Sequence, residues 1–361
     1  MKKVMLYINA IHHGGAERVM VQLAEELTRS GYDTVLVTTI LDTSWEYPLD
    51  KSVKRIILEH SSSNGDKGRL KKNISRLQKL RALCKCEKPD VLISFMPQPI
   101  MRALIATVGL PIKNIISIRN DPSKYWQTKA EKILASLFLR RAAKFVLQTE
   151  AARDFYKDSK YYERSYVICN PVDDVFFNTT NNHNSKTIIT CGRLDKQKNH
   201  TLLIDAFEIF AKDHDEWVLK IYGVGPAEKE LMRKIVEDKF EQKIILMGAS
   251  DNVPGELSNA AIFVLSSDYE GLPNALMEAL AAGVPSISTD CPCGGPASLI
   301  ENGVNGILVP VNDKEAMANA LKSLADDRLA RCQYSINAKG KAEQYRKAEI
   351  IDQWKKVINA T

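Results

Sequence analysis

Two acidic side chains, Glu270 and Glu278, stand eight positions apart beside a predicted turn. Each carboxylate can accept hydrogen bonds from a pair of hydroxyl groups, which suits a sugar and a ribose. Between them in the sequence lie the free N–H groups of a helix's first turn, and such groups hold phosphate. The spacing therefore predicts one ligand bound along both glutamates through its hydroxyl and phosphate groups.

The residues around the two glutamates predict a strand, a tight turn and a helix. Ile262–Leu265 is a short apolar run suited to a buried parallel strand. Gly271 and Pro273 mark the turn, and Asn274 is the expected N-cap of a helix that runs from Ala275. Both carboxylates then lie beyond the carboxyl end of a strand, where ligands bind in open α/β sheets.

A basic loop is the second feature that can do chemistry. Arg193 and Lys198 fall within Cys191–His200, between a predicted strand and a helix expected at Leu202–Lys212. Arginine offers a fork to phosphate oxygens, and lysine offers a point charge. Either cation alone is most simply a solvated loop residue, but together with the glutamates they favour a diphosphate site facing a cleft between domains.

Glycine turns follow two other predicted strands. His12–Arg18 contains Gly14 and Gly15 ahead of a helix, where the backbone can approach an anion, although a plain tight connection is the alternative. Gly223–Pro226 lacks the third glycine of a dinucleotide fingerprint. A nicotinamide oxidoreductase is therefore not predicted.

Strand and helix patterns alternate along the whole chain, which predicts the α/β class with doubly wound parallel sheets. In the first half we expect strands at Val4–Asn9, Asp33–Ile40, Val91–Phe95, Ile115–Ile118 and Lys144–Leu147, and helices at Ala16–Ser30, Gly68–Cys86, Ile100–Gly109 and 125–143. In the second half we expect strands at Thr187–Cys191, Val218–Tyr222, Lys243–Met247, Ile262–Leu265, Ser286–Ser288 and Gly306–Val309.

The length of 361 residues favours two domains. A polar break at residues 170–186 is the predicted linker. We therefore expect Rossmann-like domains at residues 1–169 and 170–344. A helical tail at 337–359 with Trp354 is also expected, and its part at 345–361 should pack back on the first domain.

The composition, with 45% apolar and 26% charged residues, is that of a soluble globular protein. No apolar run is long enough for a spanning helix, and Met1–Asn9 continues without a cleavage site, so a first strand and a cytoplasmic protein are expected. Residues 1–175 carry 29 Lys and Arg against 19 Asp and Glu, whereas residues 176–361 carry 21 against 25. The first half should therefore favour an anionic surface or substrate.

Seven cysteines show no disulfide framework. Cys84/Cys86 and Cys291/Cys293 have Cys-x-Cys spacing rather than the Cys-x2-Cys spacing of zinc sites, and no histidine cluster accompanies them. Asp213–Asp215 matches a metal-binding Asp-x-Asp pattern, but it ends an amphipathic helix, which indicates solvated surface. No metal site is predicted.

A helix predicted at residues 67–88 is strongly basic. A packed helix with a solvated basic face is one interpretation. The other is a face for anionic lipid headgroups or a lipid-linked diphosphate, with Lys72, Arg76 and Lys79 as contacts. Nucleic acid fits less well, because no aromatic stacking residues are interleaved.

These features form one set of motifs: Gly14–Arg18, Gly192–Leu194 with Lys198, Glu270–Asn274 with Glu278, Ala281–Pro285, and Asn302–Gly306 before Leu308–Pro310. The set resembles the retaining glycosyltransferases of family 4. The resemblance implies the GT-B architecture, in which two Rossmann-like domains face each other across a cleft. It covers essentially the whole chain and is strongest over residues 187–312.

The resemblance implies a role for each matching residue. Glu270 would lie against the donor sugar and Glu278 would hold the ribose hydroxyls, while Arg193 and Lys198 would neutralise the departing diphosphate. The other implied donor-site residues are Gly14, Gly15, Gly223, Met247, Gly271, Leu272, Pro273 and Asn274. Cations preorganised at a developing negative charge lower the barrier, so no divalent metal and no cofactor are expected. The implied mechanism is a same-face attack in which a donor phosphate oxygen takes the acceptor proton.

Two loops refine this resemblance, one by departing from the family pattern and one by matching a subgroup of the family. Many relatives carry a histidine after the fourth strand of the first domain, where this chain reads Ser117–Pro122, so Arg119 and Asn120 are expected to contact sugar or acceptor instead. The loop Asp290–Pro296 resembles one in bacterial enzymes that build polysaccharides on lipid carriers, which places its two cysteines near the donor.

The combined expectation is a bacterial enzyme that moves a hexose or N-acetylhexosamine from a nucleotide diphosphate, most simply that of uridine. The acceptor would be a lipid-linked saccharide at the inner face of the cytoplasmic membrane, with peripheral contact to anionic lipid and no nucleic-acid partner. Two alternatives stay open. One is a sugar-nucleotide epimerase of the same architecture, and the other is a non-catalytic protein that keeps the nucleotide pocket.

Overall fold

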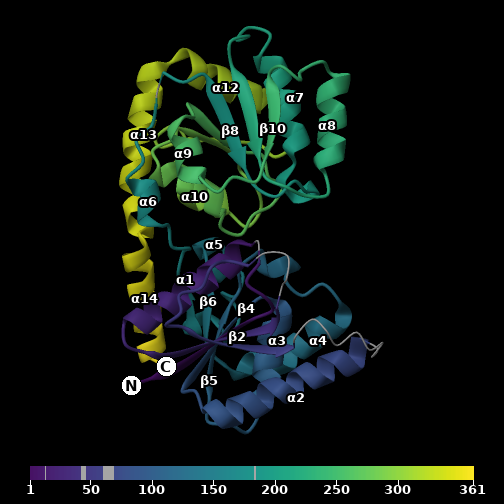
Figure 1. Ribbon diagram of the computed structural model, residues 1–361, viewed down its shortest axis with the longest axis vertical. Coiled ribbons are helices and arrows are strands. Elements are labelled where there is room, and N and C mark those ends of the chain that lie inside the picture. The colour runs from purple at the N-terminus through teal and green to yellow at the C-terminus, as the bar shows by residue number, and fades with distance from the viewer. Residues whose placement is uncertain (13, 42–45, 60–68, 183) are drawn as a thin grey trace. The chain divides into compact units, whose positions relative to one another are not determined.

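A parallel sheet organises the N-terminal part of the chain. Its strands are β1 Lys3–Ile8, β2 Asp33–Ile40, β3 Lys54–Glu59, β4 Val91–Phe95, β5 Lys113–Ser117, β6 Ala142–Leu147 and β7 Ser165–Val167. In the computed structural model (Figure 1), which describes residues 1–361 except 13, 42–45, 60–68 and 183, they stand in the order β3-β2-β1-β4-β5-β6-β7. The direction of strand addition reverses between β1 and β4, which is the point where such sheets bind ligands.

Helices connect these strands and cover the sheet. They are α1 Gly15–Arg29, α2 Arg69–Glu87, α3 Pro97–Ala106, α4 Lys129–Phe138 and α5 Glu150–Asp154. Leu6 and Ile93 of the sheet pack with Leu23 of α1 in one buried cluster, and the last helix, α14 Lys347–Asn359, adds the fully buried Trp354 to it. Each fully buried side chain of this size contributes about 1.5–3 kcal/mol, so α14 is an integral part of this core.

A second parallel sheet follows in the chain. Its strands are β8 Thr187–Cys191, β9 Val218–Tyr222, β10 Ile244–Gly248, β11 Ile262–Leu265, β12 Ser286–Thr289 and β13 Ile307–Val309, in the order β10-β9-β8-β11-β12-β13. The helices are α6 Asp174–Phe177, α7 His200–Phe210, α8 Glu228–Glu237, α9 Val253–Ser258, α10 Asn274–Ala281, α11 Gly295–Leu299, α12 Lys314–Asp326 and α13 Arg328–Ala342. Strand addition reverses here between β8 and β11. The predicted α/β class with doubly wound parallel sheets is confirmed.

The chain divides into two compact units, Met1–Asn170 with Ala348–Thr361 and Pro171–Lys347. They are called the first and second unit below. The boundary was expected between residues 169 and 170, and the structure has it between Asn170 and Pro171. Residues Ala348–Thr361 at the end of the chain belong to the first unit, and a helix at 345–361 was expected to pack there.

Several elements differ from the expectation for local reasons. The short strands β3 and β7 at the sheet edges were not predicted, because few of their side chains are fully buried. The helix expected at 125–143 is only α4, because a capping box between Thr128 and Glu131 starts it late. The expected N-cap Asn274 is instead the first residue of α10, after Pro273. The helical tail is broken at Arg346, whose backbone is extended.

Candidate functional site

The switch point of the second unit brings together the two motifs that predicted chemistry. Strands β8 and β11 are direct neighbours, with Ile188 paired to Ile262. The loop after β8 carries Arg193 and Lys198, and the loop after β11 carries Glu270. Because the chain leaves these two parallel strands in opposite directions, their loops open a crevice at the carboxyl edge of the sheet.

Hydrogen bonds hold the two loops against each other. The Asp268 backbone N–H donates to the Gln197 carbonyl at 2.9 Å, and the Gln197 side-chain amide donates to the Tyr269 carbonyl at 2.9 Å. The Ser266 hydroxyl donates to the Lys198 carbonyl at 2.9 Å. These bonds all involve backbone atoms, so they fix the backbone positions from which the Lys198 and Glu270 side chains extend.

Lys198 and Glu270 form the centre of the site. The Lys198 Nζ lies 2.6 Å from Glu270 Oε1, and the side chains are 15% and 8% exposed. The Ser267 hydroxyl, fully buried, donates to the same carboxylate oxygen at 2.7 Å. A largely desolvated ammonium beside a carboxylate can receive a phosphate on one side and a sugar hydroxyl on the other. Ser267 was not among the predicted site residues, although its position three residues before Glu270 was a usable signal.

Close backbone contacts explain why glycines line the loops. A Cβ on Gly223 would lie 1.8 Å from the Gly192 carbonyl oxygen, and the φ of Gly223 is +144°. A Cβ on Gly295 would lie 1.9 Å from the Gly271 carbonyl oxygen. Only glycine fits at either position. The backbones of the loops that hold Arg193 and Glu270 are therefore in direct contact with the backbones of Gly223 and Gly295.

Three more of the predicted donor-site residues lie in different environments. Arg193 is 63% exposed and pairs with Asp195 at 3.2 Å. Glu278 is buried on the second turn of α10. The pKa of the Cys191 thiol at the end of β8 is raised first by burial of the thiol and second by the negative charge of Glu278. Met247 is exposed on β10. Glu278 and Lys198 are thus both placed around the carboxyl end of β8.

The Gly-Gly turn belongs to the first unit. Gly14 precedes α1 with an extended backbone, and Gly15 is the first residue of that helix. A Cβ on Gly14 would meet the Glu17 carboxylate at 2.0 Å, and that flexible side chain can move aside. Gly14 and Gly15 lie beyond the end of β1, at the switch point of their own sheet, whereas His13 lies outside the described residues.

Arg119, which was expected to contact sugar or acceptor, is buried. Its guanidinium stacks 4.2 Å above the Phe95 ring, and its Nη1 donates to the Asn170 side chain at 2.8 Å. Burial lowers the pKa of the Arg119 guanidinium to about 9. Asn120 is exposed, and its side-chain oxygen accepts the Asp121 N–H at 2.9 Å. Arg119 is therefore packed into the first unit, and Asn120 is the more accessible of the two acceptor candidates.

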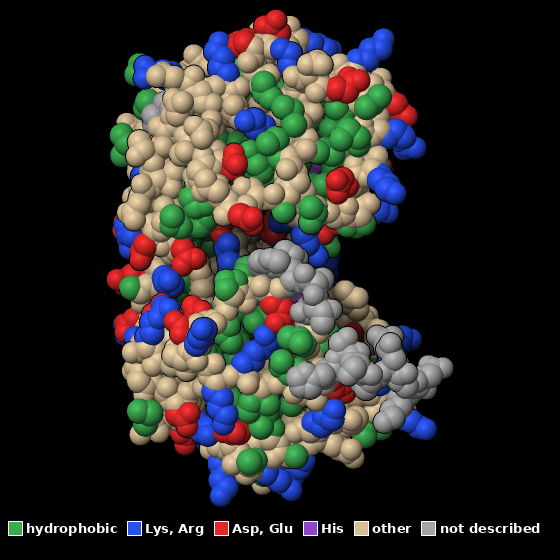
Figure 2. Space-filling view, viewed as in Figure 1, with side chains coloured by type: hydrophobic (Ala, Val, Ile, Leu, Met, Phe, Trp, Pro, Cys, Tyr) green, Lys and Arg blue, Asp and Glu red, His purple; other side chains and the backbone are tan. Residues whose placement is uncertain are grey.

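The basic helix is partly engaged with its own domain. Arg76 pairs with Glu59 at 2.9 Å, and Lys79 donates to the Leu58 carbonyl at 3.1 Å. Lys72 is exposed. Figure 2 shows Lys and Arg side chains spread over the region that Figure 1 labels α2. Residues 67 and 68, where the helix was expected to begin, lie outside the described residues.

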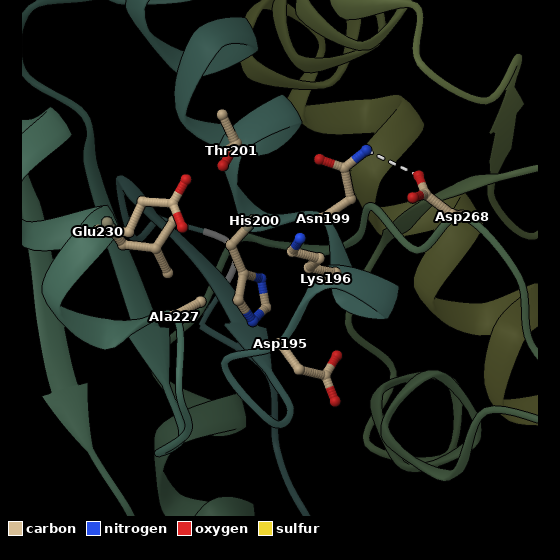
Figure 3. A pocket seen from close by; sticks show the side chains of 9 residues that line it. Asp195, Lys196, Asn199, His200, Thr201, Ala227, Glu230 and Asp268 are labelled. Carbon is tan, nitrogen blue, oxygen red and sulfur yellow. Dashed lines mark hydrogen bonds between the residues drawn. The ribbon is translucent and has the colours of Figure 1, made fainter.

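A small cavity of about 160 Å³ adjoins the Lys198 loop. His200, the first residue of α7, is buried in its lining, and Asn199 donates to Asp268 across it at 2.7 Å (Figure 3). Burial and then the positive charge of Lys198 lower the pKa of the His200 imidazole from 6.5 to about 4, while Asp195 opposes the shift. The imidazole is therefore neutral in the folded protein at neutral pH.

The folded protein is expected to lose stability as the pH falls from 6.5 towards 4. In that window the unfolded chain binds a proton at His200 that the folded chain excludes, so the free energy of unfolding should fall by at most about 1.4 kcal/mol per pH unit. Urea unfolding at several pH values measures this slope. His200→Phe should flatten it, and the exposed His12→Gln should not. An unchanged slope in His200→Phe would assign the effect to other groups.

Whether the described residues contain metal-ligand groups or membrane-spanning helices bears on the kind of site. No group of three or more His, Cys, Asp and Glu among them is placed to hold a metal ion. No disulfide joins any of the seven cysteines, and burial raises the pKa of the Cys291 thiol to about 12. Within the described ranges, no helix combines the length and apolarity needed to cross a bilayer.

Comparison with known proteins places this geometry in a family. Residues 172–341 match the model for glycosyl transferases group 1, and residues 13–176 match the model for glycosyltransferase family 4. The Anabaena HepE crystal structure in complex with UDP-glucose superposes with a TM-score of 0.83 at 17% identity, with each chain fully covered. The fold is therefore GT-B.

Two curated relatives align over nearly their whole length. An uncharacterized glycosyltransferase of Haemophilus influenzae is 27% identical over 99% of this chain and 100% of its own. An α-1,4-N-acetyl-D-galactosaminyltransferase of Campylobacter jejuni, named for a diphospho-undecaprenol-linked saccharide, is 27% identical over 99% of this chain and 98% of its own. Fold and site together define a glycosyltransferase of bacterial glycan synthesis. The chain combines a glycosyltransferase family 4 domain with a glycosyl transferases group 1 domain.

Proposed function

We propose that this protein is a retaining transferase that moves a hexose or N-acetylhexosamine from a UDP-sugar to a lipid-linked saccharide. The observation that carries the proposal is the contact of Lys198 with Glu270, 2.6 Å apart on the two loops of the switch point. One group suits a phosphate and the other suits sugar hydroxyls, so the pair matches the junction between the two halves of a nucleotide sugar.

The proposed reaction depends on stabilising the negative charge that develops on the departing diphosphate. The bond between the anomeric carbon and the phosphate oxygen breaks, and the bonding electrons leave with the diphosphate. Lys198 and Arg193 stabilise that charge, which allows transfer without a divalent metal. Glu270 positions the sugar, and Glu278 holds the ribose. The acceptor oxygen forms the new bond on the same face, and its proton passes to a donor phosphate oxygen, so the configuration is retained.

Relatives support the choice of substrates. HepE has been crystallised with UDP and with UDP-glucose, and the Campylobacter relative is named for an undecaprenol-linked acceptor. The excess of Lys and Arg in residues 1–175 suits peripheral contact with an anionic membrane at the cytoplasmic face. In this proposal the first unit receives the lipid-linked acceptor, with Asn120 and Lys72 as exposed candidate contacts.

A thermal-shift screen over nucleotide sugars tests the donor. A cognate donor at a hundred times its Kd should stabilise the protein by about 2.7 kcal/mol, and Lys198→Ala should reduce that shift. Incubation with the donor alone, followed by analysis for an epimer, tests the epimerase alternative. Transfer to an undecaprenol-linked saccharide supports the proposal. Donor binding with neither transfer nor epimerisation would favour the non-catalytic alternative.

A further inference from the structure

Helix α4 presents an apolar face to solvent in the first unit. Ile133, Leu134 and Leu137 are 61%, 39% and 49% exposed. At about 100° per residue, these three side chains cover about 100° of the helix circumference. Exposed apolar residues are common when they occur singly, whereas a contiguous apolar face marks an interaction surface.

The opposite side of α4 attaches the helix to its domain. Ala135 is buried, as is Leu139 just beyond the helix. Thr128 and Glu131 form a capping box at the start, in which the Glu131 carboxylate accepts the Thr128 N–H at 2.9 Å and the Thr128 hydroxyl accepts the Glu131 N–H at 3.1 Å. The exposed apolar face thus belongs to a well-defined, anchored helix.

Positive charge borders this face. Lys129 and Lys132 are exposed on α4, and neither forms an ion pair within the part of the chain that the structure describes. The acidic Asp121 and Glu131 nearby use their carboxylates to accept backbone N–H groups, Asp121 from Ser123 at 2.9 Å. Cations along one side of an apolar face complement anionic lipid headgroups above an acyl layer.

We propose that α4 docks this protein on an anionic membrane surface, with Ile133, Leu134 and Leu137 inserted among the acyl chains and Lys129 and Lys132 at the headgroups. This assigns the apolar insertion to α4 and not to the basic helix α2, because Ile74 at 48% is the one large apolar side chain exposed among the described side chains of α2, whereas α4 exposes three. The inference extends the membrane contact of the proposed function. Its test uses neither donor nor acceptor, so failed docking and failed transfer are distinguishable.

Flotation of the full chain with vesicles of equal parts phosphatidylcholine and phosphatidylglycerol tests the proposal. Ile133→Ser/Leu137→Ser should weaken vesicle binding about tenfold or more, because the inserted apolar area is lost. The matched control is Leu329→Ser/Ile336→Ser, which alters two apolar residues of α13 that are 80% and 66% exposed and should bind like the parent protein. Thermal unfolding verifies that both variants are folded.

Charge and self-association provide the remaining arms of the experiment. Lys129→Gln/Lys132→Gln should weaken binding to the mixed vesicles, and binding of the parent protein should fall when phosphatidylglycerol is omitted. A parent protein that does not bind, or an Ile133→Ser/Leu137→Ser variant that binds equally well, would overturn the proposal. If that variant also dissociates a parent dimer in gel filtration, the face is an interface between two copies.

Discussion

Replacing Lys198 with alanine is expected to lower kcat for glycosyl transfer by about a thousandfold, because in the proposed mechanism this largely buried ammonium stabilises the departing diphosphate. The Lys198 Nζ lies 2.6 Å from the Glu270 carboxylate, and 15% of the lysine side chain is exposed. Lys198→Arg should recover only part of the rate, because the planar guanidinium needs more space than the ammonium. Steady-state transfer from the cognate donor measures both variants.

Three further variants separate the chemistry from folding. Lys196→Ala removes an exposed cation of the same loop and should leave kcat unchanged. Ser267→Ala removes the second donor to Glu270 and should cost about tenfold. Lys198→Met/Glu270→Gln removes both charges, so it should regain stability lost in Lys198→Ala without regaining activity. Normal transfer by Lys198→Ala would remove the lysine from the mechanism.

Gly223→Ala is expected to destabilise the second unit by about 2–4 kcal/mol and to lower kcat/KM about a hundredfold. The added Cβ would lie 1.8 Å from the Gly192 carbonyl oxygen, and the φ of +144° is strained for any residue but glycine. Either Gly192 or the end of β9 must move, and Arg193 moves with Gly192. Urea unfolding and transfer kinetics of the same preparation measure the two effects.

Gly340→Ala is the matched control for this prediction. Gly340 lies inside α13, has no positive φ, and a Cβ there meets nothing within 4 Å. Alanine should therefore raise the free energy of unfolding by about 0.5–1 kcal/mol, because helix propensity improves without a clash. A Gly223→Ala variant as stable and active as the parent protein would contradict the prediction, because the loops would then accommodate the added Cβ without loss of stability or activity.

Local sequence patterns were sufficient to predict most of the second unit. The strands β8, β9 and β11 lie where they were expected, because each is a short, mostly apolar run that ends at a glycine or a serine. The first unit was harder. Its edge strand β3 mixes charged and apolar residues, and buried aromatic residues precede α4 in a stretch that reads like helix, so neither boundary was visible locally.

The sequence by itself determined the fold class, the motifs and which loops carry Arg193, Lys198 and Glu270, because turns and short apolar strands are encoded by neighbouring residues. Only the tertiary structure decided that Lys198 meets Glu270, 72 positions further on, since that contact depends on β8 lying beside β11. Burial of Arg119 against Phe95 and exposure of Ile133 on α4 were likewise decided by packing. The physical reason is that strand order and burial come from non-local contacts, which a local pattern does not contain.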